Sequence, residues 1–219
     1  MSMYMENDLT PLKKKILSLS ALAEEAVYDS VRAFNFRDRD LAGQIIEKDR
    51  EIDRLEVDVE EDCIKQFNTQ QLSPEALRYV VVVLKINNNL ERVGDLAANI
   101  AMRAIEFSEH PHTPIIFDFT AMAEYVKDML RQCLDALINS DSKQAYEVRK
   151  ADDEVDRLHR DVYRIVAQAI ENDPAKTHIF LQYISISRYF ERIGDLATNI
   201  AEDIIYLVEG RITRHQRSS

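Results

Sequence analysis

Apolar residues recur every three or four positions along most of the chain, which is the period of one face of an α-helix. One such stripe runs through Val83, Ile86, Leu90, Val93, Ala97, Ile100 and Ala104. A matching stripe runs through Ile179, Ile186, Phe190, Ile193, Ala197, Ile200 and Ile204. No segment alternates apolar and polar residues for long enough to indicate a strand. The pattern therefore predicts an all-α protein.

Local signals divide this pattern into helices. A capping residue followed by proline marks three helix starts, at Thr10-Pro11, Ser73-Pro74 and Asp173-Pro174. Softer breaks lie at residues 36–38 and 139–141, and the segment 110–114, with its prolines and histidines, is the one real linker. We therefore expect six helices, at residues 11–35, 38–70, 74–109, 116–139, 141–171 and 174–209, with Gly210 ending the last one.

The chain contains an internal repeat. The sequence ERVGDLAANIA at residues 91–101 recurs as ERIGDLATNIA at 191–201, with 9 of 11 residues identical. DREIDRL at 49–55 and DDEVDRL at 152–158 form a second pair in the same order. We therefore predict two tandem three-helix repeats, residues 1–110 and 111–219.

The repeated motifs carry acidic residues four positions apart. The four pairs are Asp49/Asp53, Glu91/Asp95, Asp152/Asp156 and Glu191/Asp195. Residues at this spacing lie one above the other on a helix, where like charges destabilise it. If consecutive helices form antiparallel hairpins, residues that face each other lie at equal distances from the turn. Residues 49 and 95, and likewise 53 and 91, are centred on residue 72, at a predicted turn. The pairs 152/195 and 156/191 are likewise centred between residues 173 and 174. Each hairpin thus brings four acidic side chains to one level.

Clustered carboxylates are hard oxygen ligands, suited to Mg²⁺, Mn²⁺, Ca²⁺ or iron. Asn99 and Asn199 follow one turn later and could add a ligand or hydrogen-bond one. The acidic stripe lies away from the core stripe, so we expect an exposed, shallow site. The alternative is a pair of solvated helix faces in which Arg92 and Arg192 neutralise the carboxylates.

Two glycines occupy helix interiors within the repeated motif. Gly94 and Gly194 each cost about 1 kcal/mol relative to alanine there. We expect a close approach at these positions, by another helix or by a metal cluster, with helix packing the favoured explanation.

Charge and composition narrow the function. With 28 Lys and Arg against 39 Asp and Glu, the net charge is −11, which argues against duplex nucleic acid and favours metal cations or basic protein surfaces. Cys63 and Cys133 are expected to be buried, reduced thiols. There is no signal peptide, and the apolar run 79–84 is far shorter than the roughly 20 residues of a membrane span. A cytoplasmic protein is therefore expected, associated with a membrane at most peripherally, through its partners.

The sequence contains no Walker loop, nucleophile elbow, zinc-protease helix or glycine-rich phosphate loop. Glu109-x-x-His112 is its only Glu-x-x-His and lies in the linker, whereas di-metal carboxylate enzymes need such pairs inside a bundle. We therefore expect no enzyme activity.

The paired motifs, their spacing and the six-helix plan resemble the PhoU family of phosphate-transport regulators. This resemblance spans nearly the whole chain. It implies two three-helix bundles related by a pseudo-twofold axis, a homodimer, and multinuclear iron or zinc clusters. All eight carboxylate positions of the family pattern are filled here. His159 matches Glu56 in the first half, so the two clusters are expected to differ in the number of metal ions they hold.

The resemblance also implies a negative regulator of phosphate uptake and of phosphate-starvation signalling. Its partners would be the ATPase subunit of a phosphate ABC transporter and a sensor histidine kinase. Two alternatives stay open: a metal-free helical scaffold whose acidic faces dock a basic protein surface, and, less favoured, a di-metal carboxylate enzyme. Bound metal distinguishes the scaffold from the regulator.

Overall fold

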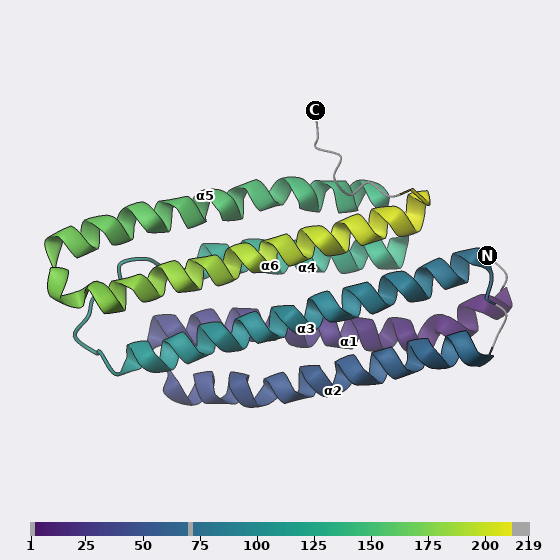
Figure 1. Ribbon diagram of the computed structural model, residues 1–219, viewed down its shortest axis with the longest axis horizontal. Coiled ribbons are helices and arrows are strands. Elements are labelled where there is room, and N and C mark those ends of the chain that lie inside the picture. The colour runs from purple at the N-terminus through teal and green to yellow at the C-terminus, as the bar shows by residue number, and fades with distance from the viewer. Residues whose placement is uncertain (1–2, 70–71, 212–219) are drawn as a thin grey trace.

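The computed structural model describes residues 3–69 and 72–211, in which the chain forms long helices and no strand (Figure 1). The helices are α1 (Met3–Phe36), α2 (Arg39–Thr69), α3 (Pro74–Ser108), α4 (Thr120–Asn139), α5 (Ser142–Asn172) and α6 (Thr177–Glu209), with a short 3₁₀-helix, η1, at Pro174–Lys176. The all-α, six-helix prediction is confirmed.

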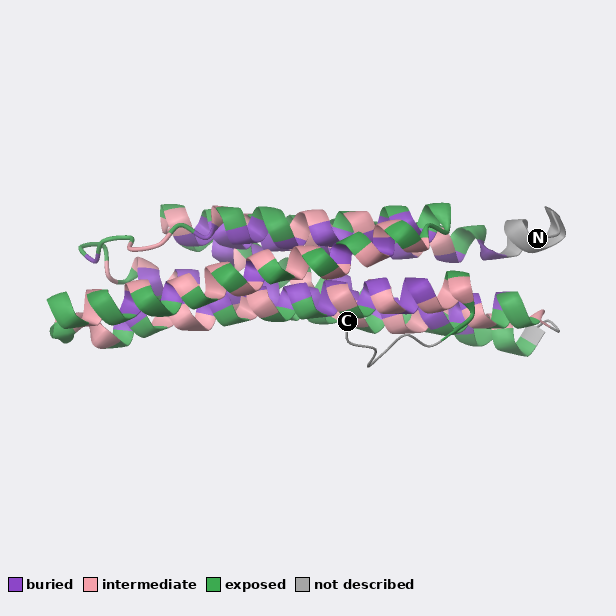
Figure 2. Ribbon diagram, turned by 90° about the horizontal axis from the view of Figure 1, so that it is seen from above, coloured by how far each residue is buried: buried purple, intermediate pink, exposed green. Residues whose placement is uncertain are grey.

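The helices form two layers. α2, α3, α6 and α5 lie side by side in that order in one layer, and α1 and α4 form the other (Figure 1). α1 packs on α2 and α3, whereas α4 packs on α5 and α6, so each half is a three-helix bundle. Buried residues line the surfaces where the layers meet, and exposed residues face outward (Figure 2).

The two halves meet through α3 and α6, which run antiparallel, and also through α1 and α4. Lys85, early in α3, pairs with Asp203, late in α6, at an Nζ–Oδ1 distance of 3.1 Å. Arg103, late in α3, lies close to the side chain of Tyr189 of α6. Because equivalent helices cross in opposite directions, the pseudo-twofold axis of the fold passes between them.

The helix starts agree only in part with those predicted from capping residues and prolines. Ser73 caps α3 as expected: its hydroxyl accepts from the Ala76 amide, and Pro74 follows at the first helical position. Asp173-Pro174 opens the 3₁₀-helix rather than α6 itself. The start at Thr10-Pro11 is wrong, because α1 begins at Met3 and Pro11 lies inside it. The apolar stripe continues across the proline through buried Leu9 and Leu12, and this burial offsets the lost hydrogen bond.

The linker is longer than the sequence indicated, and α4 begins at Thr120 instead of 116. Asp118 accepts hydrogen bonds from the amide and hydroxyl of Thr120 and from the Asn35 side chain. Phe119 is fully buried against Phe34, with ring centroids 5.5 Å apart. The aromatic contact anchors the segment before Thr120 at the end of α1.

Arg37 fastens this linker. Its guanidinium donates to the carbonyls of His110 (2.7 Å) and Thr113, and lies 4.6 Å from the centre of the Phe107 ring. Arg37→Ala should therefore lower the free energy of unfolding by about 2–3 kcal/mol, because bonds from a charged donor to backbone carbonyls are lost. Chemical denaturation measures this. The control is Arg39→Ala, which removes only an exposed 3.7 Å ion pair with Glu109 and should cost about 0.5 kcal/mol. Equal losses in the two variants would contradict the role given to Arg37.

Both cysteines are buried and unpaired, as expected. The Cys133 thiol donates to the carbonyl of Ala197, at 3.2 Å, and so links α4 to α6. In the described parts of the chain, no helix combines the length and apolar character needed to cross a bilayer.

Candidate metal centre

The antiparallel hairpins bring the predicted carboxylates together. In the first half, Gly94 of α3 lies against α2: a Cβ built on it would be 3.0 Å from Asp49 Oδ1 and 2.8 Å from Ile52 Cδ1. The same register lets the Asn87 amide donate to the Glu56 carbonyl at 2.9 Å. This is the alignment that the sequence predicted from the two turns.

The first cluster consists of Asp49 and Asp53 from α2 and Glu91 and Asp95 from α3. Burial, and then the charges of Asp53 and Asp95, raise the pKa of Asp49 to about 6. Burial also raises the pKa of Glu91, followed by the neighbouring charges of Asp95, Glu56, Asp53 and Asp49. Repulsion among these groups is thus concentrated at one level of the hairpin.

The second cluster repeats this arrangement with Asp152 and Asp156 from α5 and Glu191 and Asp195 from α6. Burial raises the pKa of Asp152 to about 7, and the charges of Asp195, Asp156 and Glu191 add to the effect. The pKa values of Glu191 and Asp195 are also raised, mainly by burial. The pKa of Asp152 is thus raised further than that of Asp49.

The clusters are less exposed than predicted. Asp53, Asp95 and Asp195 are exposed, but the other five carboxylates are partly buried. Asp49 and Asp152 lie deepest because the glycines opposite leave room for them: a Cβ on Gly194 would meet Asp152 Oδ1 at 2.5 Å. The close approach expected at both glycines therefore comes from an aspartate of the neighbouring helix, joined in the first half by Ile52.

Substitution of the glycines should separate two effects. Gly194→Ala should be neutral or stabilise by up to about 1 kcal/mol, because helix propensity improves and only the mobile end of Asp152 must move. Gly94→Ala should destabilise by about 1 kcal/mol, since its Cβ also overlaps the buried Ile52 side chain and overpacking outweighs propensity. Gly43→Ala, with nothing within 4 Å, is the propensity control. Unfolding midpoints in denaturant measure all three, and a stable Gly94→Ala would refute the packing at Ile52.

Basic side chains neutralise little of this charge. Among the eight carboxylates, as far as the structure describes the chain, only Asp156 has an ion pair, with Arg160 Nη1 at 3.9 Å. Arg92 and Arg192 instead line a basin between α3 and α6. The salt-bridged alternative is therefore not seen at contact distance, although Arg192 does lower the pKa of Asp195 against the larger effect of burial.

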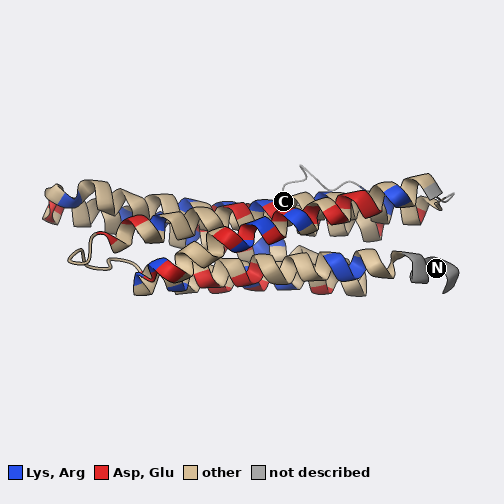
Figure 3. Cartoon of the chain, turned by 90° about the horizontal axis from the view of Figure 1, so that it is seen from below, with Lys and Arg blue, Asp and Glu red and all other residues tan. Residues whose placement is uncertain are grey.

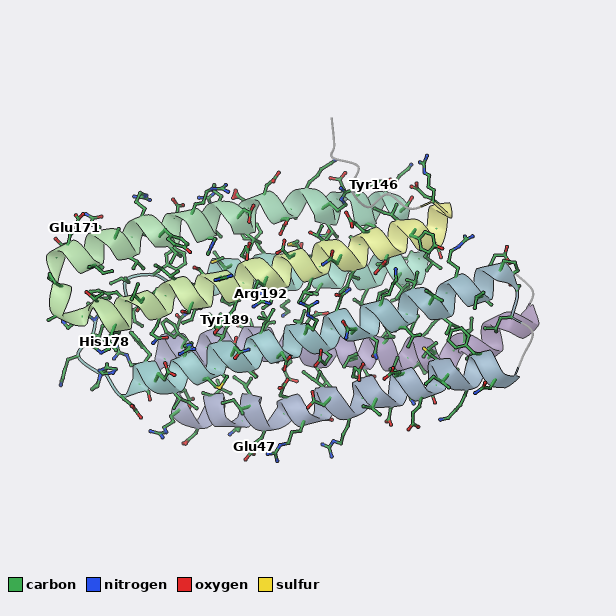
Figure 4. All side chains as sticks on the ribbon, in the orientation of Figure 1. Glu47, Tyr146, Glu171, His178, Tyr189 and Arg192 are labelled. Carbon is green, nitrogen blue, oxygen red and sulfur yellow. The ribbon has the colours of Figure 1, made fainter. Side chains whose placement is uncertain are left out.

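The basin was not predicted from the sequence. It has a volume of about 260 Å³ and lies on the pseudo-twofold axis, lined by Arg92, Asp95, Leu96, Asn99 and their counterparts Arg192, Asp195, Leu196 and Asn199. Figure 4 shows Arg192 and Tyr189 on the side of α6 that faces α3. Asp95 and Asp195 thus belong both to their clusters and to the basin, which connects the two halves. The hairpin register predicts contacts within one half only, so it could not predict a basin formed between the two halves.

Asn99 and Asn199 line the same basin. The Asn99 amide donates to the carbonyl of Asp95, at 2.8 Å, which leaves its side-chain oxygen for another partner. Their role as metal contacts stays a prediction.

The position filled by Glu56 beside the first cluster is filled by His159 beside the second. Glu56 Oε1 accepts from the Asn87 amide at 3.2 Å, whereas His159 Nδ1 lies 2.9 Å from the Ser187 hydroxyl. Burial lowers the pKa of His159. Glu56 adds a fifth carboxylate to the first cluster. Its position one helical turn after Asp53 could have predicted this from the sequence.

The donor set fits oxygen-seeking cations, because carboxylates with raised pKa values and few basic partners gain most from a nearby positive charge. As the side chains stand, however, no three acidic, histidine or cysteine groups of the described residues converge closely enough to hold one ion. Metal binding therefore requires side-chain rotation, for which the exposed Asp53, Asp95 and Asp195 have room.

Fold and site together define a duplicated helical bundle that carries one acidic cluster per half. The PhoU domain model matches residues 16–104 and 119–204. A PhoU homolog from Aquifex aeolicus, a phosphate-specific transport system accessory protein, is 35% identical over 98% of this chain and 97% of its own. The corresponding homolog from Clostridium acetobutylicum is 34% identical over 94% of each. The crystal structure of PhoU from Pseudomonas aeruginosa matches with a TM-score of 0.88 at 32% identity, over 94% of this chain and 99% of that one. The chain belongs to the PhoU family.

Proposed function

We propose that this protein is an accessory protein of a phosphate-specific transport system and acts as a negative regulator of phosphate uptake and phosphate-starvation signalling. The observation that carries this proposal is the match of both halves to the PhoU domain, together with relatives so named that align along almost the whole chain. The function rests on binding and not on catalysis, in keeping with the accessory role in those names.

The metal ions of the proposal lie at the two acidic clusters. Asp49, Asp53, Glu91 and Asp95 would hold those of the first half, and Asp152, Asp156, Glu191 and Asp195 those of the second, with Asn99 and Asn199 beside them. Iron or zinc follows from the family resemblance, and Mg²⁺, Mn²⁺ or Ca²⁺ from the oxygen donors. Bound ions would supply positive charge with open coordination positions. The chain itself fixes the level of the carboxylates, through the hairpin register and the two glycines.

The proposed partners are the ATPase subunit of a phosphate ABC transporter and a sensor histidine kinase, between which the protein acts as an adaptor in the cytoplasm, as a homodimer. Acidic and basic residues are interspersed along the outer helix faces (Figure 3), a pattern suited to polar, reversible contacts. The domain boundary at residues 110 and 111 belongs to the same proposal, with one repeat on each side of the linker.

The metal-free scaffold is the second candidate. It is favoured by the lack of three convergent ligand groups among the described side chains. In that case the acidic clusters would dock a basic protein surface directly.

Complementation tests the proposed function. In a bacterium that lacks its own PhoU, this chain should restore low transcription of the phosphate transporter genes when phosphate is plentiful. The variant with Asp49, Asp53, Asp152 and Asp156 changed to alanine should fail to restore it, whereas Glu47→Ala/Glu51→Ala, an exposed pair with the same spacing on α2, should succeed. Unchanged, high transcription with the wild-type chain would refute the regulatory role. Full activity of the cluster variant would show that the acidic clusters are not needed for this regulatory role.

A further inference from the structure

A pocket of about 580 Å³ lies at the end of the molecule where α1 and α3 begin and α4 and α6 end. It is separate from both acidic clusters. Its apolar lining comes from Leu9, Ala76, Tyr79, Leu137, Leu207 and Val208. Its volume and mainly apolar lining are typical of a small-molecule site.

The opposite end of the molecule shows how the same space is filled in the other half. Arg37 and Ser140 both follow a helix with a left-handed backbone, with φ of 54° and 53°, so α1 and α4 align on them. In this alignment Phe34 matches Leu137, and the repeat of α3 and α6 matches Phe107 to Leu207.

At the end opposite the pocket, large side chains fill the space. The Phe34 and Phe107 rings are fully buried with centroids 4.8 Å apart, and the Arg37 side chain lies over Phe107. At the pocket end, Leu137 and Leu207 stand in place of the two phenylalanines, and Ser140 stands in place of the arginine. The pocket is therefore the place where three large side chains of one repeat are replaced by smaller ones in the other.

Two cations stand at this pocket. Lys13 Nζ lies 5.7 Å from the centre of the Tyr79 ring, and the Arg78 guanidinium lies 5.7 Å from that of Tyr206. Glu75 is the one acidic residue among the described lining residues. The rings hold the two cations beside an apolar floor, so the pocket combines a hydrophobic interior with a net positive charge.

We propose that this pocket binds an anionic amphiphile, a molecule with an aliphatic chain and a carboxylate or phosphate group. The aliphatic chain of the ligand lies on Leu137, Leu207 and Val208, in the volume that phenylalanine side chains fill at the other end of the molecule. The anion pairs with Lys13 and Arg78. The same chemistry is offered by a free fatty acid and by an anionic lipid in a membrane, so the test includes both.

Isothermal titration calorimetry with sodium decanoate tests the site in the full-length protein. One decanoate should bind per chain, and decyltrimethylammonium, with the same chain and the opposite charge, should bind at least about tenfold more weakly. Lys13→Gln/Arg78→Gln should weaken decanoate binding by at least about tenfold, since both cationic partners are lost. The control Lys14→Gln/Arg54→Gln removes two exposed cations elsewhere on α1 and α2 and should leave binding unchanged.

A second variant tests the cavity itself. Leu137→Phe/Leu207→Phe copies the filled end of the molecule and should abolish binding, with helicity preserved by circular dichroism. Sedimentation with phosphatidylglycerol vesicles, against phosphatidylcholine vesicles, distinguishes a lipid in a bilayer from a free amphiphile, and either source supports the site if the filled variant loses binding. Failure to bind both decanoate and phosphatidylglycerol would overturn the proposal. So would binding that Lys13→Gln/Arg78→Gln leaves unchanged, a result that is decisive even if the filled variant does not fold.

Discussion

Glu91→Ala/Asp95→Ala should remove the metal ions of the first half and leave those of the second, so that metal per chain falls by about half. Both residues belong to α3 and lie beside Asp49 and Asp53, whose carboxylates alone would present too few ligands for a hard cation. The fold should persist, because Asp95 is exposed and Glu91 is outside the buried core. Removing mutually repelling charges should even stabilise the metal-free chain. Inductively coupled plasma mass spectrometry of the purified protein measures the loss.

The matched control is Glu47→Ala/Glu51→Ala. These residues are also acidic and four positions apart, but they are exposed, and Glu47 lies on the outer edge of α2, away from α3 (Figure 4). This variant should keep the full metal content. Equal metal in the cluster variant and the control would show that an acidic pair on a helix is insufficient evidence for a site.

Asp152→Asn should raise the thermal midpoint of the metal-free protein at pH 7.5, and by only about half as much at pH 5.5. Burial and the facing carboxylates Asp195, Asp156 and Glu191 raise the folded-state pKa of Asp152 to about 7, above its ordinary value of 3.8. The folded state therefore binds more protons than the unfolded state between these values, and its stability falls as pH rises through them.

The difference between variant and wild type isolates this residue from groups with the opposite tendency, such as His159, whose pKa is lowered by burial. Solvent screens the partly exposed carboxylate, so we expect a gain of about 2–4 °C at pH 7.5, measured by calorimetry after chelation. Asp161→Asn, on the same helix but in ion pairs with Arg157 and Arg164, should not produce such a gain. A midpoint for Asp152→Asn that is equally raised at both pH values would contradict the assigned pKa.

Much of the fold could be predicted because it depends on local patterns. Helical periodicity and the Ser73-Pro74 signal located the helices and one turn, and the repeated acidic pairs then aligned each hairpin. The position of Gly94 against Asp49 and Ile52 agrees with that alignment. Local signals failed where tertiary packing decides: Pro11 is carried inside α1 by the burial of its neighbours, and the aromatic contact of Phe119 delays the start of α4.

The candidate site was predictable only in part. Spacing along the chain identified which carboxylates meet, but the depth of Asp49 and Asp152 depends on glycines in the facing helices. The basin with Arg92 and Arg192 depends on how α3 and α6 pack across the pseudo-twofold axis, and no motif within one half specifies this contact. The same holds for the pocket near Lys13 and Arg78, which four different helices form.

The two acidic clusters are proposed to hold metal ions. The most direct test is the metal content of the native, untagged protein by inductively coupled plasma mass spectrometry, before and after chelation and reconstitution. If the clusters bind metal, the protein should carry several equivalents of iron, zinc, manganese, magnesium or calcium per chain, removed by the chelator and restored on reconstitution. No bound metal in either preparation would contradict metal binding at the clusters, and would leave their carboxylates a protein-docking or salt-bridge role in a PhoU fold.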